Sequence, residues 1–460
     1  SEALKPIVKE YHLSGITTSK IEETGRTVYK AENIPAIKQE SLSPPFNTIA
    51  PKLSARLANF SYKGYDAQVN NWNDLGKWLD ENLLKGRTDL PENTKFRAKS
   101  LVQGIEDDLE KAKIIYKYVQ DNTRYISVQI GIGGFQPISA IDVDRVKYGD
   151  CKGLSNYTKA LLEVVGVKSY YTVVEAGNTK VDFDEDFADL IQGNHAILAI
   201  PYNNGYHWID CTSQVHPFGF VGDFTDDRKV LIVKPNGGEI VKTVSYLNEQ
   251  NHQKTMAAFS LTKEGGILAE VVIDTKGVQY DNRFHLEKDP KEDVIKHYKD
   301  YWKNINNLKV QAYEFKNDRD AIVFTEEIKI SAINYGTKSG DRLLFTANAF
   351  NKNQYVPRRY RNRKLPFEIQ RGHMDEDEYT ITLPDGYDIE AIPEGQSFEN
   401  EFGSYSMSTK LNDDKKSIVY KRTLLIKKGL YPKEKYKEYR NFRKTAASMD
   451  NMQIVLIKNH

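Results

Sequence analysis

The sequence predicts an α+β protein in which a core of helices and antiparallel strands is flanked by β-sandwich-like domains. Helical patterns dominate between residues 71 and 166, and three strand-like runs follow before residue 211. Beyond about residue 236, short alternating strands and turns make up most of the chain. Helices followed by a strand meander are typical of α+β folds, and regularly spaced short strands are typical of sandwiches.

The length of 460 residues exceeds the usual size of one hydrophobic core. We therefore expect four segments, which are a β-rich N-terminal segment (1–74), a catalytic core (75–235), a β-rich domain (236–365) and a C-terminal β-rich domain (366–460). Lys+Arg number 65 and Asp+Glu 64, so the net charge of +1 gives no case for a nucleic-acid partner. No run approaches the roughly 18–20 apolar residues that a transmembrane helix needs.

The helices of the core have recognisable starting residues. Asn71 precedes the first helix, and Asp107 precedes a second helix that extends to about Asp121. A third helix follows Asp150, and Gly166 stands where the glycine after a helix is expected. Its apolar side chains recur at helical spacing, at Leu154, Tyr157, Leu161, Leu162 and Val165.

Strands are expected over residues 169–174, 195–200 and 206–210. The last two flank Asn203-Asn204-Gly205, which is a strong hairpin signal. A two-residue loop, either Asn203-Asn204 or Asn204-Gly205, places His195 and Asp210 on one face of the sheet. A three-residue loop without a bulge would place them on opposite faces. His207 faces the other side in either two-residue register.

The flanking regions contain fewer helices. A strand is expected over 27–31 near the N-terminus. Helices over 289–304 and 433–449 interrupt the β-rich C-terminal half, and a last strand covers 452–457.

Cys151 is one of only two cysteines, and it lies in the segment Tyr148–Gly153, where the third helix begins. Free N–H groups and the helix dipole stabilise a thiolate at such a position, and they can lower a cysteine pKa from about 8.5 to roughly 3.5–7.5. The alternative is a small, buried and inert cysteine. We assign that structural role to Cys211.

A nucleophilic cysteine needs a base and a group that orients the base. His195 is the predicted base, and Asp210 is the predicted orienting acid. Each residue alone could have an ordinary structural role in a strand. Together, their order and shared sheet face are those of a Cys–His–Asp site for acyl transfer.

Three motifs resemble those of the transglutaminase-like superfamily, and they are Arg145–Cys151, Asn194–Leu198 and Trp208–Ser213. The resemblance covers roughly residues 75–235 and implies a transglutaminase/papain-like core, with the cysteine at a helix N-terminus packed on an antiparallel sheet. Three further segments resemble the β-rich domains of unknown function that precede and follow this core in many bacterial proteins, and they are Tyr29–Ala36, Glu399–Tyr405 and Lys427–Pro432.

Such three-part proteins are typically exported. The resemblance therefore implies a periplasmic, cell-surface or secreted protein after removal of a leader, while a cytoplasmic location stays open. The first domain of the family is usually longer, so we expect that this N-terminus is truncated or processed. The oligomeric state cannot be inferred from the sequence.

By resemblance, Cys151 attacks an amide carbonyl to form a thioester, and the partner is a peptide, protein or other amide substrate. Hydrolysis by a peptidase or amidase is the favoured function. Transfer from glutamine to an amine is the first alternative, and a non-catalytic cell-envelope binding protein with a relic core is the second.

The backbone N–H of Cys151 is one expected oxyanion donor. Gln136 is the preferred side-chain donor, and Gln129 and Tyr125 are the other candidates. We expect no cofactor and no metal. The acidic run Asp182–Asp186 lacks the glycine and glutamate that a calcium loop of the EF-hand type requires.

Overall fold

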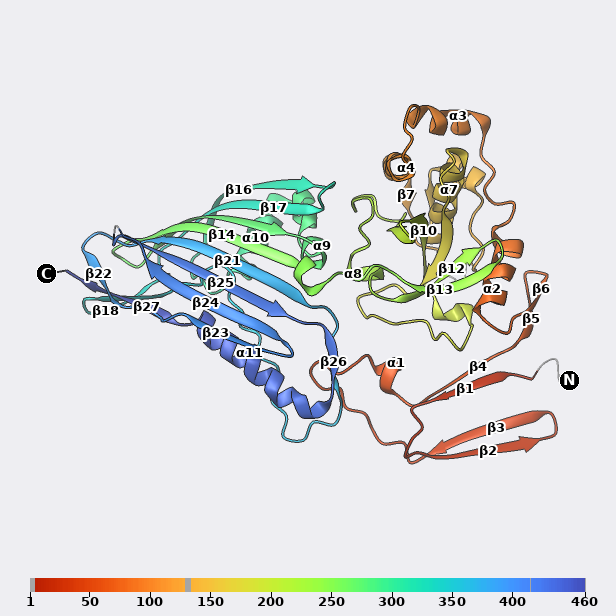
Figure 1. Cartoon of the computed structure of the whole chain (residues 1–460), viewed down its shortest axis with the longest axis horizontal. Helices are drawn as coiled ribbons and strands as arrows, with labels where there is room; N and C mark the ends of the chain where they lie inside the picture. Colours follow the sequence, from red (N-terminus) through yellow and green to blue (C-terminus); the bar gives the residue numbers. More distant parts are fainter. Residues whose placement is uncertain (1–4, 129–133, 414, 460) are drawn as a thin grey trace. The chain divides into compact units, whose positions relative to one another are not determined.

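The computed structural model describes residues 5–128, 134–413 and 415–459. The chain forms two compact units (Figure 1). Unit 1 comprises Ser1–Lys38 and Pro45–Ser245, and unit 2 comprises Gln39–Pro44 and Tyr246–His460. Among the helices of the described residues, none is both long enough and apolar enough to cross a membrane.

A five-stranded antiparallel sheet in the order β11-β10-β9-β12-β13 forms the centre of unit 1. Its strands are β9 (Tyr170–Val174), β10 (His195–Tyr202), β11 (Gly205–Ile209), β12 (Lys229–Lys234) and β13 (Gly237–Lys242). Hydrophobic clusters cover both faces of the sheet, so residues 196–200 of β10 are all buried. This double coverage explains why β10 is continuously apolar rather than alternating.

The helices of unit 1 are α1 (Phe46–Ile49), α2 (Trp72–Leu79), the π-helix η2 (Asp80–Leu84), α3 (Glu92–Leu101), α4 (Asp108–Asn122), α6 (Ala140–Val146), α7 (Cys151–Val164), η3 (Leu190–Gln192) and α8 (Gly222–Thr225). The three predicted helix starts are confirmed. The side chains of Asn71, Asp107 and Asp150 each accept a backbone N–H from the first turn of α2, α4 and α7. Gly166 has the predicted left-handed conformation, with φ of 80°.

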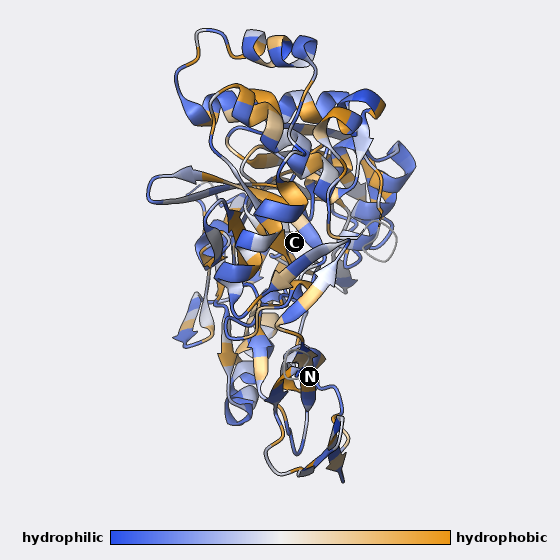
Figure 2. Cartoon of the chain, turned by 90° about the vertical axis from the view of Figure 1, so that its right-hand side faces the viewer, coloured by the Kyte–Doolittle hydropathy of each residue, from blue (hydrophilic) through white to orange (hydrophobic). Residues whose placement is uncertain are grey.

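Helices α3 and α6 were not predicted. Only Thr94 and Ala98 of α3 are buried, so α3 has no apolar stripe that would reveal it. Helix α6 spans only seven residues, which is too short for a periodic pattern. Most other helices of unit 1 carry both hydrophobic and hydrophilic residues along their length (Figure 2).

Short strand pairs make up the N-terminal part of unit 1. They are β1 (Ile7–Tyr11) with β4 (Lys52–Arg56), β2 (Thr17–Glu23) with β3 (Arg26–Glu32), and β5 (Asn59–Tyr62) with β6 (Tyr65–Gln68). A parallel bridge pairs β7 (Arg124–Tyr125) with β8 (Tyr148–Gly149) just before α7. Strand β1 is tied to the acidic run, because Lys9 Nζ and Tyr11 OH both donate to Asp184, at 2.7 and 2.5 Å.

Unit 2 contains an eight-stranded sheet in the order β16-β17-β15-β14-β21-β25-β24-β23 (Figure 1). Its strands are β14 (His252–Leu261), β15 (Ile267–Thr275), β16 (Lys309–Asp318), β17 (Val323–Ala332), β21 (His373–Thr382), β23 (Gln396–Asn400), β24 (Gly403–Leu411) and β25 (Ser417–Ile426). A second sheet contains β18 (Thr337–Ser339), β19 (Arg342–Thr346), β27 (Gln453–Lys458) and β22 (Tyr387–Ala391), and a separate pair joins β20 (Phe367–Ile369) to β26 (Gly429–Tyr431).

The helices of unit 2 are η4 (Asn248–Gln250), α9 (Val278–Asp281), η5 (Phe284–Lys288), α10 (Lys291–Tyr301), η6 (Lys433–Lys435) and α11 (Tyr436–Asp450). Helices α10 and α11 and the strand β27 correspond to the elements expected over 289–304, 433–449 and 452–457.

The sequence predicted 236–365 and 366–460 as separate domains, but residues 246–460 belong to one structural unit, and residues 236–245, with β13, belong to unit 1. Strand β14 from the first segment pairs in parallel with β21 from the second. One hydrophobic cluster extends from Ala257 to Leu456 and includes residues of both sheets, α10 and α11. The boundary at residue 365 therefore does not separate two cores, because the central strand pair of the large sheet crosses it.

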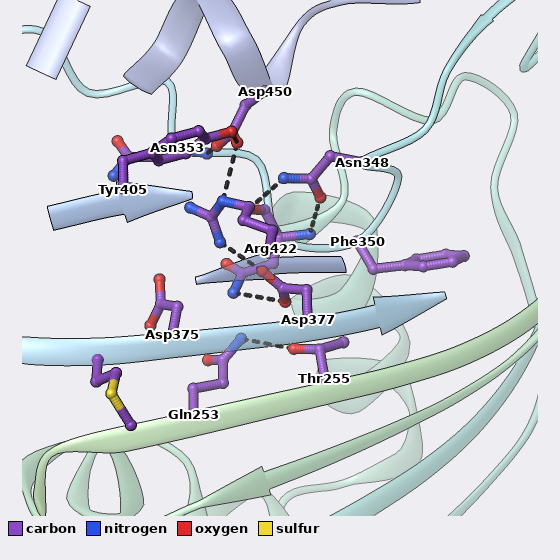
Figure 3. A network of polar contacts seen from close by, with 12 residues as sticks. Gln253, Thr255, Asn348, Phe350, Asn353, Asp375, Asp377, Tyr405, Arg422 and Asp450 are labelled. Carbon is purple, nitrogen blue, oxygen red and sulfur yellow. Dashed lines mark hydrogen bonds and ion pairs between the residues drawn. The ribbon is translucent and has the colours of Figure 1, made fainter. Parts of the chain in front are cut away.

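A buried ionic network lies within unit 2 (Figure 3). Arg422 on β25 forms ion pairs with Asp377 on β21 and, at 2.8 Å, with Asp450 at the end of α11, and these three side chains are inaccessible to solvent. Tyr405 OH donates to Asp450 at 2.7 Å. Burial raises the pKa of Asp377 to about 6, although the Arg422 charge opposes this rise. The Arg422 guanidinium therefore compensates the negative charges of two carboxylates, whose ionised forms burial would otherwise disfavour.

We expect Arg422→Met to lower the free energy of unfolding of unit 2 by about 3–5 kcal/mol, because the two carboxylates would stay buried without their cation. Urea unfolding measured on the full chain tests this value. The matched control is Lys421→Met, which removes a half-exposed lysine that pairs with Glu378 at 3.2 Å on the outer face of the same strand. If Arg422→Met and Lys421→Met lowered the free energy of unfolding equally, the result would contradict a stabilising role for the buried network.

Candidate active site

Cys151 is the first residue of α7, as the sequence predicted, and it is a free cysteine. The Asp150 side chain caps the helix by accepting the Gly153 N–H at 2.8 Å. The N–H groups of the first turn have no acceptors within the helix, so they point at the region beside the thiol. Only 7% of Cys151 is exposed. The sulfur is thus buried at the N-terminal end of a helix.

The hairpin between β10 and β11 has the predicted two-residue loop. Tyr202 pairs with Gly205, and Asn203 and Asn204 adopt the positive φ angles, 46° and 60°, that such a turn requires. In this register His195 begins β10 and Asp210 directly follows β11. Their side chains meet, with His195 Nε2 and Asp210 Oδ2 at 2.8 Å.

Asp210 is held in place by further hydrogen bonds. Its Oδ1 accepts both the Thr212 N–H at 2.9 Å and the Thr212 hydroxyl at 2.6 Å. The Tyr116 hydroxyl donates to its backbone carbonyl at 3.0 Å. The carboxylate therefore has one oxygen committed to Thr212 and the other directed at His195.

His195 lies between the acid and the thiol. Burial lowers its pKa, but the Asp210 charge and hydrogen bonds to Asp210 and Cys151 outweigh burial and raise the pKa to about 10. Burial likewise raises the pKa of Asp210, but the His195 charge and the Thr212 hydrogen bonds lower it to about 2. Because Nε2 contacts Asp210, Nδ1 is the ring nitrogen that remains for the thiol. The arrangement favours an imidazolium paired with a carboxylate near neutral pH.

The His195 resonance is expected to show no titration between pH 5 and 8 in histidine NMR spectra. Protonated His195 stabilises the fold by its full amount at pH values below the pKa of about 6.5 that histidine has in the unfolded chain. This stabilisation is lost as the pH rises toward the folded-state pKa of about 10. The free energy of unfolding should therefore fall between pH 6.5 and 10, and fall less in Asp210→Asn. A His195 midpoint near 6.5 in the native protein would contradict the ion pair.

A cavity of about 30 Å³ adjoins Cys151 and His195. Its other walls are mainly apolar and include Leu79 of α2 and Leu83 and Leu84 of η2, and π-helical turns often occur at functional sites. A volume of this size is sufficient for about one water molecule. Phe135 also lines the cavity and packs against Tyr62, with ring centroids 5.8 Å apart. The Cys151 and His195 side chains are thus largely buried.

Sequence reasoning missed several residues of this site. Lys152 lines the cavity, is 7% exposed and forms an ion pair with Asp150. Tyr171 of β9 also lines the cavity. The ring of Phe224 packs edge-on against the His195 ring, with ring centroids 5.5 Å apart. Lys152 could have been noticed as the charged neighbour of the cysteine. Tyr171 and Phe224 carry no local signal, because only the fold brings them to the site.

The predicted side-chain oxyanion donors are not supported by the lining of the cavity. Gln136 is half-buried, and the lining contains its neighbour Phe135 instead of Gln136. Tyr125 is 42% exposed and does not line the cavity either. Gln129 lies outside the described residues.

The side chains of His207 and Cys211 pack elsewhere than beside His195. His207 stacks on Phe218 with ring centroids 4.6 Å apart, and burial lowers its pKa. Cys211 is 4% exposed and packs in the cluster beneath α7. Burial raises the pKa of its thiol to about 12. Both residues have the structural positions that the sequence indicated.

A search of residues 5–128, 134–413 and 415–459 finds no three His, Cys, Asp or Glu side chains grouped to hold a metal ion.

Residues 341–456 match a family described as "Domain of Unknown Function with solved-structure structure (DUF3858)". This match lies within unit 2 and covers about a quarter of the chain. No curated protein matches the sequence.

A solved structure of a protein from Parabacteroides distasonis, described as a "putative protease", resembles the whole chain with a TM-score of 0.59. The alignment covers 99% of this chain and 70% of that protein, at 14% sequence identity. At this identity the likeness concerns the fold.

Proposed function

We propose that the protein is a cysteine-dependent amide hydrolase, most simply a peptidase, with Cys151 as nucleophile, His195 as base and Asp210 as orienting acid. The observation that carries the proposal is the contact of His195 with both partners, the Asp210 carboxylate at 2.8 Å and the Cys151 thiol. The fold likeness to a protein described as a protease agrees with this function. In this proposal residues 75–235 form a transglutaminase-like core.

In the first half-reaction, the Cys151 thiolate attacks the amide carbonyl carbon while His195 holds the thiol proton. The developing oxyanion is stabilised by N–H groups at the start of α7, beginning with that of Cys151. His195 then donates its proton to the leaving amine, and the C–N bond breaks. A thioester on Cys151 and a free amine result.

In the second half-reaction, water attacks the thioester carbonyl and His195 accepts a proton from that water. The C–S bond breaks, the acid is released and the thiol is restored. The cavity of about 30 Å³ beside Cys151 and His195 offers room for one water molecule. Asp210 holds the ring in one tautomer throughout and stabilises the imidazolium.

The proposed substrate is a peptide, protein or other amide, and the proposed location is the periplasm or the cell surface. Both proposals rest on the resemblance of the three site motifs and flanking segments to exported transglutaminase-like proteins. Leu79, Leu83 and Leu84 line the cavity, so the proposal places α2 and η2 beside the bound substrate.

A library of fluorogenic peptide amides and glutamine amides, incubated with the full chain with and without an alkylamine, tests the proposed function. Hydrolysis without added amine is the expected result. Product that forms only with the amine would assign the acyl-transfer alternative instead. If neither reaction occurs and Cys151 is inert to thiol reagents at every pH, the non-catalytic alternative holds.

A further inference from the structure

Unit 2 contains a second cavity, of about 340 Å³, which is independent of the cysteine site. It lies at the end of α10, where Tyr301 and Asn304 line it, and beside residues 350–355 of the long connection after β19. Asp375 of β21 also lines this cavity, and it lies two residues before Asp377 of the buried ionic network. The volume falls within the roughly 300–1,000 Å³ typical of small-molecule sites.

Asp375 provides a buried carboxylate with unused hydrogen-bonding capacity. It is 8% exposed, and its Oδ1 accepts the Gln279 side-chain amide at 3.0 Å. Asp377 is the neighbouring acid on the same face of the strand, and its charge is instead compensated by Arg422 (Figure 3). Asp377 also accepts a hydrogen bond from the Asn351 side-chain amide at 3.1 Å. No cation within the described residues forms an ion pair with Asp375. Its second oxygen is therefore available to a hydroxyl or N–H donor in the cavity.

Lys352 adds a positively charged side chain to the lining of this cavity. It is half-buried, and its ammonium forms no hydrogen bond or ion pair with the residues that the structure describes. Burial lowers its pKa, although the Asp450 charge opposes this. A partly buried donor without an acceptor is unfavourable unless a ligand or water supplies the missing oxygen.

Neutral amides and aromatic rings complete the lining. Asn304 donates its amide N–H to the Ala349 carbonyl at 2.9 Å, which leaves its side-chain oxygen as an acceptor. Tyr355 is 47% exposed, and Arg443 lies 5.0 Å from its ring centroid. An exposed aromatic ring of this kind can pack against the C–H face of a ligand.

The charges of the lining select the class of ligand. An anion would be attracted by Lys352 and by the exposed Lys303 but repelled by the buried Asp375, and a cation would meet the reverse. A neutral polyol can donate to Asp375 and accept from Lys352 at the same time, because each hydroxyl both donates and accepts. We infer that this cavity is a saccharide-binding site, in which the sugar hydroxyls bridge Asp375 and Lys352 and the sugar ring packs on Tyr355.

Titration of the full chain with glucose, galactose, N-acetylglucosamine, cellobiose and chitobiose, followed by calorimetry and ligand-observed NMR, tests the inference. At least one of these sugars is expected to bind saturably. Lys352→Met and Asp375→Asn should each weaken that binding about tenfold or more, because each removes a charge-assisted hydrogen bond. The matched control, Lys338→Met, replaces an exposed lysine of β18 in the same unit and should bind like the wild type.

Thermal unfolding of each variant separates loss of binding from loss of fold, and Tyr355→Ala at the exposed ring provides a second test with little risk to the core. The inference is overturned if none of the five sugars binds saturably, or if the Lys352, Asp375 and Tyr355 variants, still folded, bind as tightly as the wild type. Binding of inorganic phosphate or glycylglycine that depends on Lys352, without sugar binding, would also overturn it.

Discussion

Cys151→Ala is expected to reduce amide hydrolysis by roughly 10⁴–10⁶-fold, because without the thiol no thioester can form. The fold should remain intact, since alanine fits the first position of α7 and Asp150 still caps the helix. Initial rates on the best peptide from the library measure the effect. Intact-protein mass spectra with a slow ester substrate should show an acyl adduct only in the wild type.

The matched control is Cys211→Ala, which removes the other cysteine. Cys211 is buried beneath α7 in the adjacent cluster, so its loss should change stability modestly and activity by less than tenfold. Activity that survives Cys151→Ala but disappears in Cys211→Ala would refute the assignment of the nucleophile.

Asp210→Asn should lower kcat by about 10⁴-fold with little change in structure. An amide can still contact His195, but it no longer stabilises the imidazolium and can hold the ring in the wrong tautomer. The pKa of His195 should fall at the same time, because the Asp210 charge is the main influence that raises this pKa against burial. Histidine NMR titrations and kcat on the same peptide follow both effects.

Asp186→Asn is the control for the loss of an acidic residue in unit 1. The Asp186 side chain is 90% exposed, and within the described residues its only ion pair, to Lys9, is 3.7 Å long. We expect its kcat to match that of the wild type. If Asp210→Asn kept its kcat within tenfold of the wild type while circular dichroism showed a native fold, Asp210 would not be the orienting acid.

Local signals were sufficient to predict most of the elements that build the site. Asp150 before an apolar stripe marked the start of α7, and Asn203-Asn204-Gly205 fixed the register of the hairpin that carries His195 and Asp210. These signals act within a few residues, through caps and turn geometry. The proximity of the three side chains follows from them once α7 packs on the sheet.

Features that depend on distant segments were not predictable. The cover of the cavity by η2 and Phe135 depends on tertiary packing and leaves no periodic pattern. The union of the two predicted β-rich domains depends on the parallel pairing of β14 with β21, which are far apart in the sequence. The buried polar face of β21, with Asp375 and Asp377, reads in the sequence as a solvent-exposed acidic run.

The rate of Cys151 alkylation by iodoacetamide, measured from pH 5 to 9 in the wild type and in His195→Ala, tests the proposed thiolate–imidazolium pair most directly. Comparing rates within one protein removes the effect of the burial of Cys151, which slows the reaction at every pH. Relative to its own rate at pH 9, the wild type should react faster at neutral pH than His195→Ala does, because a neighbouring imidazolium favours the thiolate. Identical profiles that both rise above pH 8 would contradict activation of Cys151 by His195.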